Sequence, residues 1–451
     1  MEITEEFKQL ELLLEFNQSV SSESTFSNSE RFGTFQDSMS APIHRWFKYP
    51  AGFSYKLVEE LISDFNLNSK SLVIDPFAGC GTTAVTAKQN GINSIGIEAH
   101  PFVYWVAQAK CFWEYDMKKL RQSITNLLAY LQSPPPFPGS DVLKNFPELL
   151  GKCYSDENLW VLKFIRDSIE SFVCTKEEKD FLKIALTDSL RTASKAGTGW
   201  PYIAPGKYHQ KNEQPALRVF GETLWGMYKD LTIVQANCAK NQPETNIFFR
   251  DTRQPYPVER EIVDLAITSP PYLNNYDYAD RTRLEMYFFG LANSWGDITK
   301  IVRNKLIMAA TTQVRRKDFH DTPLSQEILE LDPLLYREIS EKIFSLSKER
   351  LQKGGKKSYD LMVAGYFNDM IKVIEQVYKV LKPGATFALV LGDSAPYGVY
   401  IPTEEYLGRL ALTLGFRSYH VQNLRNRGEK WKNNTHRHNL LLKEGILFLK
   451  K

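Results

Sequence analysis

Two short segments of this sequence combine residue types that could bind a small charged ligand and act on an amine. The first reads DPFAGCGTT at residues 75–83, and the second reads TSPPY at residues 268–272. In the first, glycines allow the backbone to approach a ligand closely, and an acid directly precedes the turn. In the second, two consecutive prolines lack amide hydrogens and stiffen the chain. The Ser269 carbonyl is therefore expected to be fixed and free to accept from an amine, and Tyr272 offers a flat ring.

The elements around the first segment are typical of a nucleotide-binding unit. An apolar run, Leu72–Ile74, precedes Asp75, and a helix-forming run follows the glycine turn as far as Asn90. A second short apolar run, Ser94–Ile97, ends on Glu98. This order of strand, glycine turn, helix, strand and acid is found in one half of a doubly wound α/β sheet. Glu98 is placed to accept hydrogen bonds from the hydroxyls of a ribose.

Further along the chain, two more strands are expected to end at the same edge of the sheet. Residues 246–250 predict a third strand with Asp251 at its tip, and residues 262–268 predict a fourth that ends at Ser269. In open α/β sheets, ligands bind outside the carboxyl ends of the strands. We therefore expect Asp75, Glu98, Asp251 and Ser269 to converge on one crevice. With strands at 386–391, 417–424 and 439–450, the sequence predicts seven strands in a doubly wound α/β fold.

Together the two segments resemble the motifs of the S-adenosylmethionine-dependent DNA amino-methyltransferases, the cytosine-N4 and adenine-N6 family, whose motifs read DPFxGxGTT and TSPPY. The resemblance implies a seven-stranded Rossmann-like methyltransferase sheet and S-adenosylmethionine as the methyl donor. It also implies that the target base flips out of duplex DNA and receives the methyl group in one direct in-line transfer. The motif order departs from many relatives with a serine motif, because here the cofactor motif comes first.

The resemblance assigns roles to individual residues. The catalytic residues that it implies are Ser269, Pro270, Pro271 and Tyr272. The cofactor-binding residues that it implies are Trp46, Phe53, Asp75, Pro76, Phe77, Gly79, Gly81, Thr82, Thr83, Glu98 and Asp251. Residues 46–53 could instead be an aromatic packing element, and Asp251 could cap a turn. None of the cysteines follows a proline, as a ring-carbon methyltransferase would require, and Cys80 is interpreted as a small filler of the turn.

The two motifs do not by themselves decide which base is methylated. Serine before Pro-Pro-Tyr favours the N4 amine of cytosine, and adenine N6 is the alternative. A third reading is an RNA guanine-N2 methyltransferase, since similar motifs serve guanine amines. A non-catalytic DNA-binding relative is disfavoured because both motifs are intact.

The chain is longer than the sheet requires, and the excess predicts two insertions. We divide it into residues 1–40 as an N-terminal helix and linker, 41–111 as the cofactor-binding part of the catalytic domain, 112–245 as a helical insertion, 246–272 as the part with the catalytic motif, 273–358 as a second insertion and 359–451 as the C-terminal part of the catalytic domain. Either insertion could recognise DNA. Basic residues interleaved with aromatic ones suggest DNA contact in the loop 191–211 and at Arg281, Arg283, Arg425, Arg427, Lys430 and Trp431.

Composition limits the classes of partner, site and cellular location that the sequence can indicate. The formal net charge of +3 is too small to indicate a polyanionic partner by itself, so any basic face must be local. Five widely spaced cysteines without a CxxC pair predict neither disulfides nor a metal site. No apolar run is long enough to span a membrane, and no signal pattern is seen, so we expect a cytoplasmic protein. Duplex DNA is the expected partner of a monomer that acts independently of any cognate restriction endonuclease.

Overall fold

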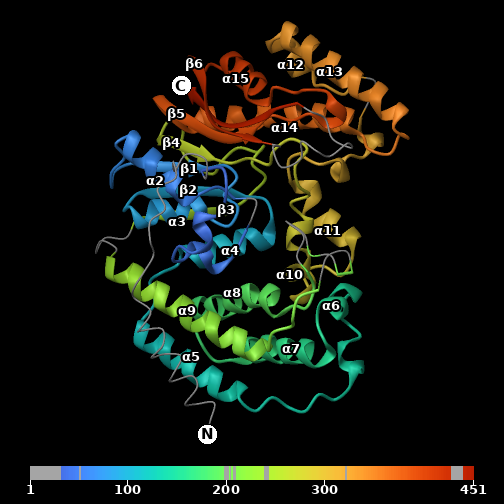
Figure 1. The fold of residues 1–451 in the computed structure, drawn as a ribbon. Helices are drawn as coiled ribbons and strands as arrows, with labels where there is room; N and C mark the ends of the chain where they lie inside the picture. The colour runs from blue at the N-terminus through green and yellow to red at the C-terminus, as the bar shows by residue number, and fades with distance from the viewer. Residues whose placement is uncertain are drawn as a thin grey trace.

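A computed structural model describes residues 32–49, 52–197, 203, 205–206, 210–237, 243–319, 322–427 and 440–451. Its centre is one seven-stranded sheet in the order β3-β2-β1-β4-β5-β7-β6 (Figure 1). The first five strands pair in parallel, and β7 runs antiparallel to both β5 and β6. The strands are β1 (Leu72–Asp75), β2 (Asn93–Glu98), β3 (Thr245–Phe249), β4 (Val263–Thr268), β5 (Leu381–Gly392), β6 (Ser418–Arg427) and β7 (Leu442–Lys450). The predicted doubly wound α/β sheet is confirmed.

Alternate residues of the central strands enter two separate cores, as the pleat of a strand requires. Val73 and Leu265 belong to the core that contains α2, whereas Ile74 and Ala266 belong to the core that contains α14. Because both faces are covered by helices, the central strands are mostly apolar. The helices nearest the sheet are α2 (Tyr55–Asp64), α3 (Thr82–Gln89), α4 (Pro101–Cys111), α14 (Tyr359–Val380) and α15 (Thr403–Thr413).

One strand begins earlier than its sequence suggests. The segment Lys382-Pro383-Gly384 predicts a break before a strand at residue 386, yet β5 already starts at Leu381. The register between β4 and β5 shifts at this point, since Val263 pairs with Leu381 and Leu265 with Thr386. Gly384, with φ of 78°, provides the left-handed backbone at this irregularity. The turn residues are therefore absorbed as a bulge inside the strand.

The chain between β2 and β3 forms a separate lobe of helices on one side of the sheet (Figure 1). The lobe's helices are α5 (Met117–Leu131), α6 (Glu148–Cys153), α7 (Asp156–Ser171), α8 (Lys176–Ala193) and α9 (Ala216–Asn237). Their apolar faces share one core with α4 and with the aromatic segment before α2. A capping box between Thr175 and Glu178 starts α8. The four longest helices lie where the apolar periodicity of the sequence predicts them.

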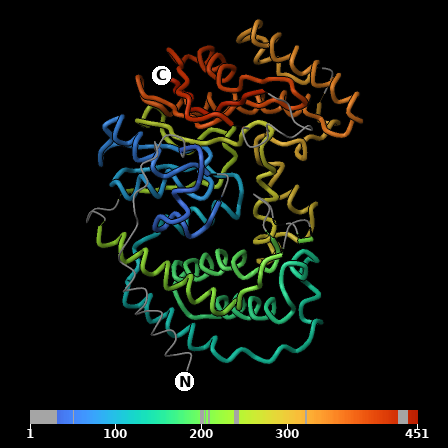
Figure 2. Tube along the Cα trace, in the orientation of Figure 1, coloured from blue at the N-terminus to red at the C-terminus, as the bar shows by residue number. Residues whose placement is uncertain are grey.

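The chain between β4 and α14 divides into two parts that pack in different places. Its first helices, α10 (Arg283–Phe288) and α11 (Trp295–Ile301), lie between the sheet and the helical lobe, and α10 contacts α6. Its later helices, α12 (Gln326–Leu331) and α13 (Pro333–Gln352), pack against α14 and α15 at the other end of the molecule (Figure 2). Within the described residues, no helix has the length and apolar character needed to cross a membrane.

Candidate active site

A buried aspartate joins the two segments that carry the chemistry. Asp75, at the tip of β1, is 1% exposed. The Thr268 hydroxyl at the tip of β4 donates to Asp75 Oδ1 at 2.6 Å, and the Thr83 hydroxyl donates to Oδ2 at 2.7 Å. The Phe77 amide also donates to Oδ1, at 3.0 Å. Burial raises the pKa of Asp75 to about 6, although these hydrogen bonds oppose the rise. Asp75 thereby holds the glycine turn against the end of β4.

A pocket that is partly open to solvent lies directly beside this junction. The glycine turn forms one wall, the start of the Pro-Pro segment forms another, and the aromatic segment before α2 forms a third. The lining residues are Tyr49, Gly52, Phe53, Phe77, Ala78, Gly79, Cys80, Thr82, Glu98, His100, Ser269, Pro271, Tyr278 and Leu306. Residues far apart in the sequence therefore line one cavity.

Glu98, at the tip of β2, presents a buried carboxylate to this pocket. The Gly79 amide donates to its Oε2 at 2.8 Å, and the His100 amide donates to its Oε1 at 2.7 Å. Gly79 adopts a φ of 53°, a conformation that glycine tolerates readily, and this turn aims its amide at the carboxylate. Burial raises the pKa of Glu98 to about 7. A ligand with hydroxyl donors would stabilise the ionised form, and a ribose offers two of them.

At this point the chain can be compared with known proteins. A family model for N6/N4 methyltransferases, described as "DNA methylase", matches residues 11–109. The Type II methyltransferase M.BsoBI of Geobacillus stearothermophilus is 26% identical over 438 residues, which cover 90% of this chain and 84% of that protein. M.AvaI of a Nostoc strain is 26% identical over 86% of this chain and 82% of its own length, and M.MvaI of Kocuria varians is 23% identical over 88% and 86%.

The chain belongs to the N6/N4 DNA methyltransferases. Methyltransferases of this family use S-adenosylmethionine, and the pocket of this methyltransferase has suitable chemistry for it. A buried acid faces the cavity beside a turn whose glycines permit close approach, and aromatic rings of Phe53 and Phe77 form apolar walls. The carboxylate suits the ribose hydroxyls, and the rings suit the flat adenine.

The structure brings five of the predicted cofactor residues to the pocket and leaves the others behind its wall. The residues that line it are Phe53, Phe77, Gly79, Thr82 and Glu98. The residues outside the lining are Trp46, Asp75, Pro76, Gly81, Thr83 and Asp251. Asp75 and Thr83 instead hold the turn through their mutual hydrogen bond. Gly81 supports the turn from behind, since a Cβ there would lie 3.4 Å from the Cβ of Ala107.

Trp46 packs into the helical lobe of the methyltransferase and does not reach the pocket. Its indole Nε1 donates to Asp230 Oδ2 at 3.0 Å, and its ring contacts Phe181 edge to face. Arg45 forms an ion pair with the same aspartate at 2.6 Å. For Trp46 the packing alternative therefore describes the structure, whereas Tyr49 and Phe53 of the same segment line the cavity.

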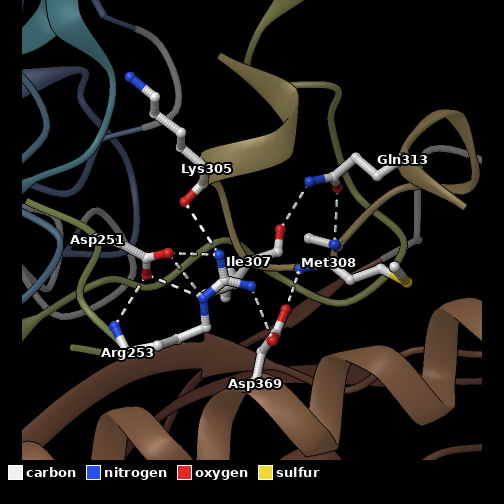
Figure 3. Close-up of polar contacts among 8 residues, drawn as sticks. Asp251, Arg253, Lys305, Ile307, Met308, Gln313 and Asp369 are labelled. Atoms are coloured by element: carbon white, nitrogen blue, oxygen red, sulfur yellow. Dashed lines mark hydrogen bonds and ion pairs between the residues drawn. The ribbon is translucent and has the colours of Figure 1, made fainter. Parts of the chain in front are cut away.

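Asp251 takes part in an ion-pair cluster beside the pocket (Figure 3). Its carboxylate accepts from Arg253, with the closest contact at 2.6 Å, and Arg253 also pairs with Asp369 of α14 at 2.9 Å. Asp369 accepts from the Met308 amide at 2.9 Å, and Arg253 donates to the Lys305 carbonyl. The cluster fixes the chain on both sides of Leu306, which does line the pocket. In this arrangement Asp251 helps to position the loop that carries Leu306 into the pocket lining.

The two ends of the catalytic segment have different surroundings. Ser269 and Pro271 face the pocket, and Pro270 is buried. Tyr272 is 7% exposed, and its hydroxyl donates to Glu444 Oε1 at 2.9 Å. The guanidinium carbon of Arg427 lies 5.4 Å from the centre of the Tyr272 ring. The predicted stacking surface is therefore covered in this structure.

Arg281 and Arg283, predicted to contact DNA, form structural contacts instead. Arg281 is 3% exposed, lies over the rings of Phe47 and Tyr49, and pairs with the fully buried Glu285. Arg283 pairs with an aspartate at 3.0 Å, and its guanidinium lies 4.3 Å from the centre of a tryptophan ring. Their positions offer little surface to a phosphate.

The remaining predicted DNA contacts lie on β6 or beyond it. Arg425 forms an ion pair with Glu444, and Arg427 covers Tyr272. Lys430 and Trp431 lie outside the described residues. In the loop 191–211, Arg191 pairs with Glu285 at 2.6 Å. It therefore joins α8 to α10.

Seven residues of the pocket lining are not among the predicted catalytic and cofactor-binding residues: Tyr49, Gly52, Ala78, Cys80, His100, Tyr278 and Leu306. His100 could have been predicted from its position, because it lies two residues after Glu98, the acid at the tip of β2. Burial lowers its pKa to about 3, so it is neutral, and its Nδ1 accepts from the Phe102 amide at 3.3 Å. Its Nε2 then donates to the Thr282 hydroxyl at 2.7 Å. Leu306 has no local signal, because a long insertion brings it back to the pocket.

Proposed function

We propose that this methyltransferase transfers the methyl group of S-adenosylmethionine to the exocyclic N4 amine of a cytosine in a specific duplex DNA sequence. The observation that carries the proposal is the shared pocket, in which the glycine turn and Glu98 lie on one side and Ser269 and Pro271 on the other. A cofactor held by the turn would present its methyl group beside the Ser269 carbonyl. The bound cofactor supplies an electrophilic methyl group that needs no covalent enzyme intermediate.

The roles of the protein groups follow from their positions. Glu98, Phe53 and Phe77 line the pocket, where Glu98 would accept the ribose hydroxyls and the two rings would pack on the cofactor. The Ser269 carbonyl, which lies before a proline, accepts a hydrogen from the target amine and orients the nitrogen lone pair toward the methyl group. The apolar rings around the pocket exclude water and strengthen these contacts. Catalysis then depends on alignment and electrostatics, as an in-line displacement requires.

Serine before Pro-Pro-Tyr is commoner among the resembled enzymes that act on the N4 amine of cytosine, and this tendency supports cytosine as the target, with adenine N6 as the alternative. The family description names DNA, and the relatives are Type II methyltransferases, so DNA is favoured over RNA. We further propose that the enzyme works as a cytoplasmic monomer, independently of any cognate restriction endonuclease. Light scattering during size-exclusion chromatography of the enzyme, free and bound to DNA, tests the monomer.

A methyl-transfer assay with labelled cofactor tests the reaction. Duplex DNA and bulk tRNA are compared as substrates, and the modified nucleoside is identified by mass spectrometry. We expect N4-methylcytosine from duplex DNA, and sequencing of the product locates the recognition site. N6-methyladenine would establish the alternative target, and methylation of tRNA alone would overturn the proposal.

Substitutions in the catalytic segment separate chemistry from cofactor binding. Tyr272→Ala should lower the transfer rate by at least about 100-fold, because the base loses its stacking surface. Ser269→Ala should lower it less, because the backbone carbonyl remains. Both variants should bind cofactor nearly as well as the wild type does. Ser40→Ala, at an exposed serine away from the pocket, serves as the control. Loss of cofactor binding in the Tyr272 variant would contradict the assigned role.

A further inference from the structure

The stacking surface of Tyr272 is closed in the DNA-free protein. A flipped base can stack only on an exposed ring face, and Tyr272 is 7% exposed. The structure therefore lacks room for a base against this ring, although Ser269 next to it faces the pocket. Either the ring or its cover must move before a base can bind.

The ring itself is held firmly. Its hydroxyl donates to Glu444, which is 2% exposed and also pairs with Arg425. The Tyr272 amide donates to the Tyr278 hydroxyl at 3.3 Å, so the backbone is tied as well. Two prolines precede Tyr272 and restrict its backbone further. Rotating the ring away would break buried hydrogen bonds, which makes the ring the costlier group to move.

The cover is a more weakly held side chain. The Arg427 guanidinium lies over the ring at 5.4 Å, and its hydrogen bond to the Asp393 carbonyl is long, at 3.5 Å. The side chain is only partly buried, and it sits at the end of β6. A glycine makes room for it, since a Cβ at Gly392 would lie 2.8 Å from Arg427 Nη1. A flat guanidinium that lies over a tyrosine ring occupies space that a stacked base would need.

The surroundings of Arg427 offer the displaced cation other partners. Asp393 is 4% exposed and accepts from the Tyr400 hydroxyl at 2.6 Å. Burial raises the pKa of the neighbouring Glu404 to about 9, so at neutral pH Glu404 is protonated and adds no negative charge. Glu444, which accepts from the Tyr272 hydroxyl, already pairs with Arg425. Asp393 and Glu444 are therefore the acids near which a guanidinium that leaves the ring face can stay.

We propose that the Arg427 guanidinium occupies the target-base site and is exchanged for the base when DNA binds. Arg427 is then a positioning residue that sets how readily a flipped base reaches Tyr272. This inference rests on the proposed function, because it assumes that a base stacks on Tyr272. It assigns Arg427 a place inside the base site, distinct from a contact with a DNA phosphate.

Binding of two duplexes tests the exchange. Both carry the recognition site located by the methylation assay, and one of them has an abasic position in place of the target base. Their dissociation constants are measured by fluorescence anisotropy at several salt concentrations, with S-adenosylhomocysteine present. Arg427→Ala and the polar but uncharged Arg427→Gln should improve binding of the base-containing duplex, relative to the abasic one, by about five-fold. Removing the Arg427 side chain should strengthen binding only of the duplex that has a base to insert.

The control is Lys443→Ala, which removes an exposed charge from the neighbouring strand without touching Tyr272. It should leave the ratio of the two dissociation constants unchanged and weaken both equally. If Arg427→Ala behaves like this control, Arg427 contacts phosphate and the exchange is wrong. A ratio that changes in the opposite direction overturns the exchange too. The methyl-transfer assay shows separately whether the wild type methylates DNA, and a failure there would refute the proposed function itself.

Discussion

The raised pKa of Glu98 makes the affinity for the cofactor depend on pH. In the free enzyme, burial raises this pKa from 4.5 to about 7. Hydroxyl donors bind the carboxylate form, which makes up roughly one eleventh of the enzyme at pH 6 and roughly ten elevenths at pH 8. The affinity should therefore rise about ten-fold from pH 6 to pH 8. The stability of the free enzyme should change in the opposite direction.

The sign of that stability change follows from linkage. The folded enzyme holds the Glu98 proton more tightly than the unfolded chain does, so stability falls as the pH rises from about 4.5 to 7. A difference of two to three pKa units corresponds to about 3 kcal/mol, which is an upper limit. Bound cofactor should restore part of this loss, because its hydroxyls stabilise the carboxylate.

Calorimetric titration with S-adenosylhomocysteine at pH 6, 7 and 8, at constant ionic strength, measures the effect. Glu98→Gln is the matched variant, since it keeps the shape and cannot ionise. Its affinity should be weaker at pH 8 and should vary little with pH. Any pH dependence that remains in this variant would report Asp75, whose pKa is about 6. Equal pH dependence in both proteins would refute the role of Glu98.

Three further substitutions probe buried contacts, each by urea unfolding. Thr268→Val removes the hydroxyl that donates to Asp75 and should lower the free energy of unfolding by about 2 kcal/mol at pH 8. The loss should be smaller at pH 5, where Asp75 is protonated. An equal loss at both pH values would contradict a hydrogen bond to the ionised Asp75 carboxylate. Arg281→Ala should cost about 3 kcal/mol, because Glu285 loses a buried partner, and should leave the salt dependence of DNA binding unchanged; a shallower dependence would place Arg281 at the DNA. Asp230→Ala should lower the free energy of unfolding by about 3 kcal/mol, because the Trp46 indole loses its hydrogen-bond acceptor. The affinity for the cofactor should hardly change. A large loss of that affinity would indicate that Trp46 contributes to cofactor binding.

The sheet could be predicted from the sequence because its signals are local. Apolar runs that end on Asp75, Glu98 and Ser269 mark strand tips, and parallel strands bring their tips to one edge. The pocket then forms where the tips of β1 and β4 meet. Local patterns were sufficient for these residues, since each one follows its strand directly.

The fate of individual charged and aromatic side chains could not be predicted in the same way. The basic and aromatic pattern around Arg281 is equally typical of a DNA contact and of a buried ion pair. The distant contacts that decide between them are the rings of Phe47 and Tyr49, over which Arg281 lies, and Arg191, which pairs with Glu285 from 94 residues before it. Trp46 likewise depends on Asp230 of the helical lobe. Such outcomes follow from tertiary packing, which no short window of sequence contains.

The ion pairs at Glu285 have a consequence for protein engineering. Arg191 comes from the helical lobe, whereas Glu285 lies in α10 and Arg281 directly precedes that helix, and Glu285 is fully buried. In a chimera whose lobe comes from a relative without an arginine at the position of Arg191, Arg281 would remain the ion-pair partner of this buried glutamate. Grafts that exchange the lobe between such enzymes should therefore exchange the lobe and α10 as one unit.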